Sequence, residues 1–218
     1  MSNRKASCRK QVIDFIKEMI LAGEIKPGER LKEAYIAAAT GLSRAPVREA
    51  LVELCRDGIL DFEPNRGVTV TRPSAESISA RYVVCSLLEG HIAASSLPHF
   101  TPRVIKKLEA ILEEMRAVPL GEGAQTALND LDAKFHDLIL GASDNIYLTQ
   151  FARTHNGKLE HFFFSPFWEE LYDPEFFHAR HLRIVEALKN KDKEGVETAI
   201  HEHYAQTTKC LAKFAHLL

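Results

Sequence analysis

Three histidines and one aspartate have the types and spacing of metal ligands. Asp132 and His136 are four residues apart in a strongly periodic segment, so both side chains point to one side of one helix. His181 and His203 are equidistant from the junction at residues 190–192, which is too short for anything but an antiparallel helical hairpin. Each lies about 11 residues, or roughly 16 Å, along its helix. We therefore expect these two histidines to stand side by side.

Asp132, His136, His181 and His203 would place three imidazoles and one carboxylate inside a helical bundle. This donor set suits zinc, and nickel or manganese are served by the same ligands. His178, three residues before His181, is a further possible donor at the side of the stripe. The alternative is that these histidines are ordinary core residues, each with one hydrogen bond.

Two arginines near the N-terminus have the spacing expected of a DNA-reading helix. Val47, Leu51 and Leu54 follow the spacing of a buried helical stripe. Arg44 and Arg48, four residues apart, are left together on another face near the start of this helix. There a guanidinium can bind guanine O6 and N7 in the major groove, or a phosphate. The alternative is that surface arginines and paired helices occur in many all-α proteins.

The surrounding elements would position these arginines. Residues 33–39 are rich in alanine and favour a helix, which Gly41 ends because glycine adopts a reversing backbone at no steric cost. Ser43 can cap the second helix through its hydroxyl. An alternating pattern then predicts a β-hairpin, or wing, with a cationic tip. Its strands pair Leu60 and Phe62 with Val68 and Val70 across a turn at residues 65–67.

Composition limits the class of protein. The chain has 218 residues, of which 45% are hydrophobic and 27% charged, as in ordinary globular proteins. Its 4 cysteines form no C-x-x-C pair, so no disulfide framework or thiolate zinc site is predicted. No apolar signal core or membrane-spanning stretch is present, so we expect a cytoplasmic protein without membrane contact. The net charge of -2 divides into 13 basic and 10 acidic residues (+3) over 1–72, and 15 and 20 (-5) over 73–218.

The predicted fold is mainly α, with a winged helix-turn-helix followed by an all-α antiparallel helical bundle. The sequence Arg72-Pro73-Ser74 interrupts strand pairing and offers a helix cap, so we place a domain boundary there. The DNA-binding domain would span 1–73, and the effector-binding and dimerisation domain 74–218. About six helices are expected in the second domain, at 75–96, 102–117, 124–142, 146–164, 174–190 and 193–217.

Four motifs of the N-terminal third resemble the DNA-binding domain of the GntR family of bacterial winged-helix regulators. They are Pro27-Gly28-Glu29-Arg30-Leu31, Ser43-Arg44-x-Pro46-Val47-Arg48-Glu49-Ala50-Leu51, Asp57-Gly58-Ile59-Leu60 and Arg66-Gly67-x-x-Val70. The resemblance implies that the matching positions approach an operator on double-stranded DNA, with the wing glycine in the minor groove. These positions are Arg30, Ser43, Arg44, Ala45, Arg48, Arg66 and Gly67.

The remainder of the chain is similar to the FCD effector domain of the FadR-like subgroup, in its shorter VanR-type form. The matching motifs are Asp132-x-x-Phe135-His136, Ser143-x-Asn145-x-x-Leu148 and His181-x-x-Ile184-x-x-Ala187-Leu188, with Asp192 and His203. The resemblance implies a zinc, nickel or manganese ion on the four positions named above, beside a small carboxylate effector. It also implies an effector pocket near Arg81, Cys85 and Asn145.

One position departs from the family pattern. Members commonly carry a pocket arginine four residues before a glutamate, and if Glu89 is that glutamate, Cys85 takes the arginine's place. Arg81 could substitute only if the helix is shifted. The α-helix that begins near residue 75 thus lacks the arginine that in the family can pair with an organic-acid effector.

The expected function is a ligand-responsive transcription regulator, specifically a repressor, and not an enzyme. A homodimer would place two recognition helices about 34 Å apart on a palindromic operator. Two alternatives are a metal-dependent hydrolase with an incidental winged helix, and a regulator whose pocket holds no metal. The hydrolase is disfavoured because three histidines and an aspartate already fill a tetrahedral shell, whereas catalytic zinc keeps one position for water.

Overall fold

The structure is a computed structural model that describes residues 2–119, 121, 123–155, 162–164 and 174–214. The chain divides between Pro73 and Ser74 into two compact units. Each unit has its own hydrophobic core. No helix among the described residues is both long enough and apolar enough to cross a membrane.

The first unit is a winged helix-turn-helix. It comprises α1 (Ser2–Leu21), α2 (Glu33–Thr40), α3 (Arg44–Arg56), β1 (Leu60–Glu63) and β2 (Gly67–Val70). Its core is formed by apolar side chains from all three helices and the sheet, including Ile16, Ile36, Leu54 and Leu60. The mainly α fold with a small two-stranded wing agrees with the sequence prediction.

The turn between α2 and α3 forms as the sequence predicts. Gly41 ends α2 in the left-handed region, with φ +67°. The stripe of Val47, Leu51 and Leu54 is buried, as its spacing requires. Ser43 occupies the N-cap position of α3 with an extended backbone, but its side chain accepts no capping hydrogen bond, so this detail of the prediction is wrong.

The wing has the predicted register. Leu60 pairs with Val70 and Phe62 with Val68 in an antiparallel ladder. The tip turns through Asn65 at φ 69° and closes with Arg66 N donating to Glu63 O at 3.1 Å.

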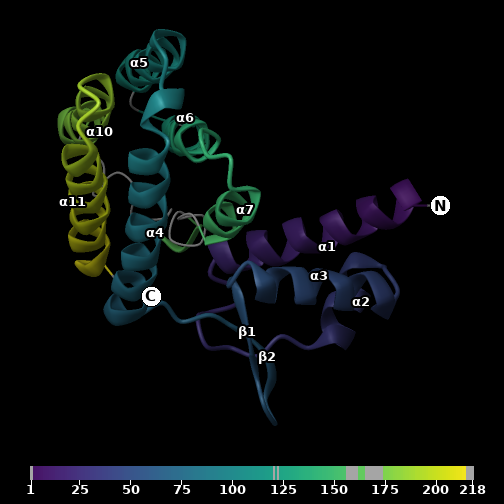
Figure 1. The fold of residues 1–218 in the computed structure, drawn as a ribbon. Coiled ribbons are helices and arrows are strands. Elements are labelled where there is room, and N and C mark those ends of the chain that lie inside the picture. The colour runs from purple at the N-terminus through teal and green to yellow at the C-terminus, as the bar shows by residue number, and fades with distance from the viewer. Residues whose placement is uncertain (1, 120, 122, 156–161, 165–173, 215–218) are drawn as a thin grey trace. The chain divides into compact units, whose positions relative to one another are not determined.

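The second unit is an all-helical bundle. Its helices are α4 (Ala75–Ser95), the 3₁₀ turn η1 (Leu97–His99), α5 (Pro102–Ala117), α6 (Ala124–Leu140), α7 (Ile146–His155), α10 (Pro174–Lys189) and α11 (Lys193–Ala212). Figure 1 shows α11 lying along α4, with α10 beside α11. Helix α4 begins with a capping box in which Ser74 accepts from Ser77 N, as expected of a helix that follows Pro73.

The α10–α11 hairpin confirms the junction that the sequence predicts. Lys191 turns the chain at φ 55°, and the Asp192 carboxylate caps α11 by accepting from Gly195 N at 3.0 Å. Helix α11 ends at Ala212, earlier than expected, because Lys213 and Phe214 bond back three residues and tighten the last turn. Part of the predicted helix 146–164 lies outside the described residues.

Candidate metal centre and DNA-contacting surface

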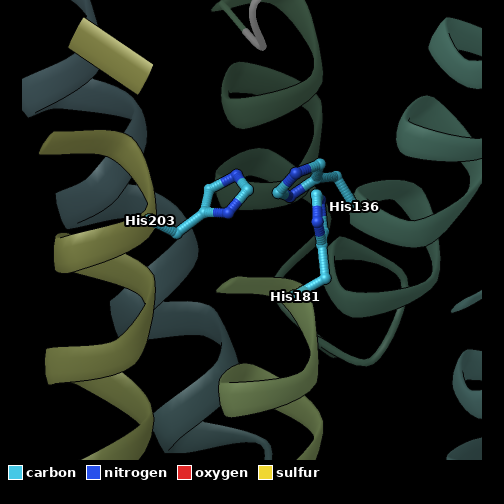
Figure 2. Close-up of side chains that lie close together, drawn as sticks. All are labelled: His136, His181 and His203. Atoms are coloured by element: carbon cyan, nitrogen blue, oxygen red, sulfur yellow. The ribbon is translucent and has the colours of Figure 1, made fainter. Parts of the chain in front are cut away.

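Three imidazoles from three helices meet inside the bundle. His136 on α6, His181 on α10 and His203 on α11 each offer one nitrogen, and these atoms all lie within 4.8 Å of one another. Figure 2 shows the three rings pointing toward a common centre. The rings of His181 and His203 are 4.6 Å apart between centroids, as their symmetric placement about the hairpin turn predicts. All three side chains are buried.

Asp132 reaches two of these three histidines. Its Oδ1 lies 2.9 Å from His181 Nε2 and 3.8 Å from His136 Nε2. The four residues predicted as ligands thus gather in one region. The imidazole nitrogens of His136, His181 and His203 form the compact group, and Asp132 joins it through His181 and His136.

Glu89 fixes the orientation of the cluster, a role that the sequence did not reveal. This buried carboxylate lies with Oε1 2.6 Å from His136 Nδ1, and its Oε2 accepts from the Tyr204 hydroxyl at 2.5 Å. His181 is held in the same way, with Nδ1 2.7 Å from Phe177 O. When each Nδ1 donates, the Nε2 atoms of His136 and His181 are left for a cation. The sequence held one signal that could have pointed to this role, because Glu89 is the sole acidic residue between positions 77 and 101.

The electrostatics of the cluster favour one bound positive charge. Burial opposes protonation of His136, but the Glu89 and Asp132 carboxylates outweigh it and raise the pKa of His136 to about 9. Burial lowers the pKa of His181, and burial together with nearby positive groups lowers the pKa of His203 further. His181 and His203 are therefore in the neutral form that a metal ligand needs, whereas a divalent ion would have to displace the proton that His136 holds.

The hydrogen bonding of His203 provides a test of whether the residues present fit a metal ion. Its Nδ1 is buried and has no hydrogen-bond partner in the described part of the chain. A buried polar atom without a partner costs about 1–3 kcal/mol, so such an atom requires an explanation. A cation between the three rings would supply its partner. The donor set therefore fits zinc or a similar divalent ion.

The three residues expected at the effector pocket have different positions. Cys85 is buried on α4, and Arg81, one turn earlier, is half-buried. Asn145 is exposed, and its Oδ1 accepts from Leu148 N at 3.1 Å. Asn145 therefore caps α7, and its exposure argues against a place in the buried cluster. The place of Asn145 in an effector pocket stays a prediction.

The predicted DNA-contacting residues of α3 lie on its exposed face. Ser43, Arg44, Ala45 and Arg48 are all exposed. Arg48 Nε forms an ion pair with Glu33 at 2.9 Å. An exposed pair of this kind contributes little stability, so the guanidinium can exchange it for a phosphate or a base.

The remaining predicted contacts gather at the wing. Arg66 pairs with Glu63 at 2.8 Å at its tip. Gly67 has φ +85°, and a Cβ added there would lie 3.6 Å from Nε and Nη2 of Arg30, so the exposed Arg30 side chain lies against the wing glycine. Arg30 also forms an isolated β-bridge with Thr69. Arg30, Arg66 and Gly67 thus share one end of the first unit.

Comparisons with known families assign both units. Residues 8–70 match the family described as bacterial regulatory proteins, gntR family. Residues 80–206 match the FCD domain.

Relatives with known names are transcriptional regulators. The chain is 29% identical over 194 residues to the uncharacterized HTH-type transcriptional regulator YdhC of Bacillus subtilis, covering 89% of this chain and 86% of the relative. It is 24% identical to the transcriptional repressor RspR of Escherichia coli, over 88% of this chain and 84% of that one. It is 28% identical to the gluconate operon transcriptional repressor of Bacillus subtilis, over 92% and 83%.

Solved structures share the fold. Escherichia coli McbR/YncC superposes with a TM-score of 0.67 at 24% identity, covering 94% of this chain and 97% of that one. A putative GntR regulator from Rhodococcus gives a TM-score of 0.64 at 22% identity, over 95% and 98%.

Proposed function

Because this chain belongs to the GntR family of bacterial regulatory proteins and carries an FCD domain, we propose that it is a ligand-responsive repressor controlled through a metal-containing pocket. It is a transcriptional regulator of the GntR/FCD type and not an enzyme. The metal-dependent hydrolase considered from the sequence is thereby set aside. The metal, the effector, the homodimer and the repressor role constitute the proposal.

Residues 1–73 would bind the operator, and residues 74–218 would bind the effector and dimerise. The exposed face of α3, with Arg44 and Arg48, would enter the major groove, and the wing with Arg66 and Gly67 would contact the minor groove. Two such units in a homodimer match the two half-sites of a palindromic operator. The repressor role is supported by the names of two relatives, RspR and the gluconate operon repressor.

One observation carries the metal proposal. Three buried imidazole nitrogens lie within 4.8 Å of one another, and the Nδ1 of His203 has no partner among the described residues. His136, His181, His203 and Asp132 would hold the ion, most simply zinc, with nickel or manganese as the other candidates. The ion would supply a Lewis-acidic anchor for an effector group. Glu89 and Phe177 O would orient the two imidazoles that they contact.

Effector binding would act by shifting the dimer between states that bind the operator and states that do not. Such a shift requires that the effector bind the two states with different affinities. The buried cluster is suited to this role, because its donors come from three separate helices, α6, α10 and α11. A ligand that changes their spacing changes the packing of the bundle.

Operator binding is tested by a gel shift on DNA upstream of the gene for this protein. Changing Arg44 and Arg48 to alanine should weaken binding by at least about tenfold, since each removes a base or phosphate contact. The matched control, Arg103→Ala with Arg116→Ala on exposed positions of α5, removes the same charge and should bind normally. Equal binding by both double variants would remove α3 as the recognition helix.

The metal is tested by elemental analysis of protein purified without chelator. Wild type should carry about one zinc, nickel or manganese ion per chain, and His136→Ala and His203→Ala should lose it. The control is His201→Ala, which alters an exposed histidine two residues from His203. The same metal content in wild type and both cluster variants would refute the ligand set and favour a pocket without metal.

A further inference from the structure

The turn at Pro27 and Gly28 lies beside the wing, and the two arginines that flank β2 both reach it. Gly28 N donates to Val70 O at 2.8 Å, which ties the turn to the end of β2. Arg66 Nη2 donates to Gly28 O at 3.5 Å, and Arg72 Nη2 donates to Pro27 O at 3.2 Å. The two guanidiniums therefore contact adjacent carbonyl groups of one turn.

Gly28 provides the space that the Arg72 side chain occupies. This glycine has φ +82°, a backbone conformation that residues with a side chain rarely adopt. A Cβ at this position would lie 2.6 Å from Nη2 and 3.1 Å from Cζ of Arg72, so its nearest neighbours would be guanidinium atoms. The guanidinium thus lies directly over the backbone of the turn, where the missing side chain leaves room for it.

The positive charge of Arg72 is available to a ligand. The residue is exposed, and it forms no ion pair with a carboxylate in the part of the chain that the structure describes. Two acidic side chains of the wing and the turn are already engaged. Glu63 pairs with Arg66 at 2.8 Å, and Glu29 accepts from Lys26 N at 2.9 Å. The described hydrogen bond of Arg72 uses a single N–H, and a guanidinium has several more that can bind an anion.

Arg72 adds a third guanidinium to those already found around the small sheet. Arg30 lies against Gly67, and Arg66 and Arg72 meet at the turn. The resemblance to the GntR family implies DNA contacts at Arg30, Arg66 and Gly67, but not at Arg72. Arginines beside a wing that enters a groove are placed to meet the phosphates at the edge of that groove.

We propose that Arg72 binds a backbone phosphate of the operator, next to the groove that the wing enters. Its guanidinium is held in advance by Pro27 O and by the space over Gly28, so less side-chain freedom is lost when a phosphate binds. A phosphate contact adds affinity and fixes the register of the wing without reading sequence. The inference rests on the proposed binding of the operator by residues 1–73, and it adds one residue to that interface.

The salt dependence of DNA binding tests this contact. Fluorescence anisotropy measures affinity over a range of salt concentrations, with DNA upstream of the gene and with a scrambled duplex of the same length and composition. In Arg72→Gln, the slope of log affinity against log salt concentration should become shallower by about 0.9, the value for one phosphate contact. Affinity should fall by about tenfold on both duplexes, because a hydrogen bond to a charged group is lost. Arg72→Lys keeps the charge and should keep the slope.

The matched control is Arg56→Gln, which removes the same charge from an exposed position in the last turn of α3. It should bind both duplexes with the affinity and slope of wild type. A slope in Arg72→Gln equal to that of the control overturns the proposal. Thermal unfolding followed by circular dichroism identifies a structural role, because a lower midpoint in Arg72→Gln with weaker binding at an unchanged slope also overturns it.

Failure of operator binding itself gives a different result. Wild type would then bind the upstream DNA no more tightly than the scrambled duplex, and changing Arg44 and Arg48 to alanine would have no effect, which removes both proposals. If the inference alone fails, wild type prefers the upstream DNA and the α3 double variant loses that preference, but Arg72→Gln behaves as wild type.

Discussion

At the residue scale, Glu89 connects the cluster to the rest of the bundle. One oxygen lies against His136 Nδ1 and the other accepts from Tyr204, so a single carboxylate on α4 orients residues of α6 and α11. Its negative charge is also a main reason why the pKa of His136 rises to about 9. Glu89 therefore affects both the direction and the charge state of a proposed metal ligand.

Replacing Glu89 by glutamine tests this role. The amide keeps the size of the side chain but removes the charge and one acceptor, so we expect zinc affinity to fall by about 10–100-fold. Competition with a chromogenic chelator measures the change. Glu109→Gln, at an exposed residue paired with Lys189 at 2.7 Å, should leave the affinity unaltered. An unaltered affinity in Glu89→Gln would show that His136 needs no oriented partner.

The same residues show what sequence can and cannot predict about the site. The proximity of His181 and His203 follows from counting along one hairpin, because helix geometry is regular between residues joined by a short turn. Glu89 acts on the cluster from another helix, α4. Its role depends on side-chain direction and tertiary packing, which local periodicity does not determine.

At the element scale, the residue at which α11 begins determines how far along that helix His203 lies. It therefore determines whether His203 stands opposite His181 on α10. Asp192 accepts from Gly195 N, and a Cβ added at Gly195 would lie 2.2 Å from the Asp192 carboxylate, so the cap and the glycine fit each other closely. The elements of the fold were largely predictable because caps, glycines and apolar stripes are local signals. The exceptions are helix ends, where frayed or tightened last turns differ little in energy.

Removal of this cap should destabilise the bundle modestly. Asp192→Ala leaves a backbone donor of α11 without its side-chain partner, and we expect the free energy of unfolding to fall by about 1 kcal/mol. Urea unfolding followed by circular dichroism provides the measurement. The comparison is Asp144→Ala, whose side chain is 92% exposed and should change nothing measurable. Equal stability of the two variants would argue that the turn alone sets the hairpin.

At the scale of the whole molecule, exposed apolar side chains on α4 and α7 indicate where a second copy would bind. The two helices pack together through Leu88, Ile92, Leu148 and Ala152. Next to these residues in the sequence are exposed apolar side chains, namely Val83, Val84 and Leu87 on α4 and Ile146, Tyr147 and Phe151 on α7. Exposed apolar groups in this number are typical of an interaction surface.

We expect a charge on each helix of this surface to dissociate the proposed dimer. Leu87 is 64% exposed and Tyr147 is 78% exposed, so Leu87→Asp with Tyr147→Asp should fold normally and sediment as a monomer. A monomer can bind only one half-site of the operator. It loses the increase in affinity that comes from joining two DNA-binding units in one dimer, so operator affinity should fall by about 100-fold. Leu21→Asp alters an apolar residue of α1 that is 46% exposed and serves as the comparison in analytical ultracentrifugation. If the double variant still sediments as a dimer, the contact between copies must lie on another face, since two buried aspartates at an apolar interface would each require desolvation.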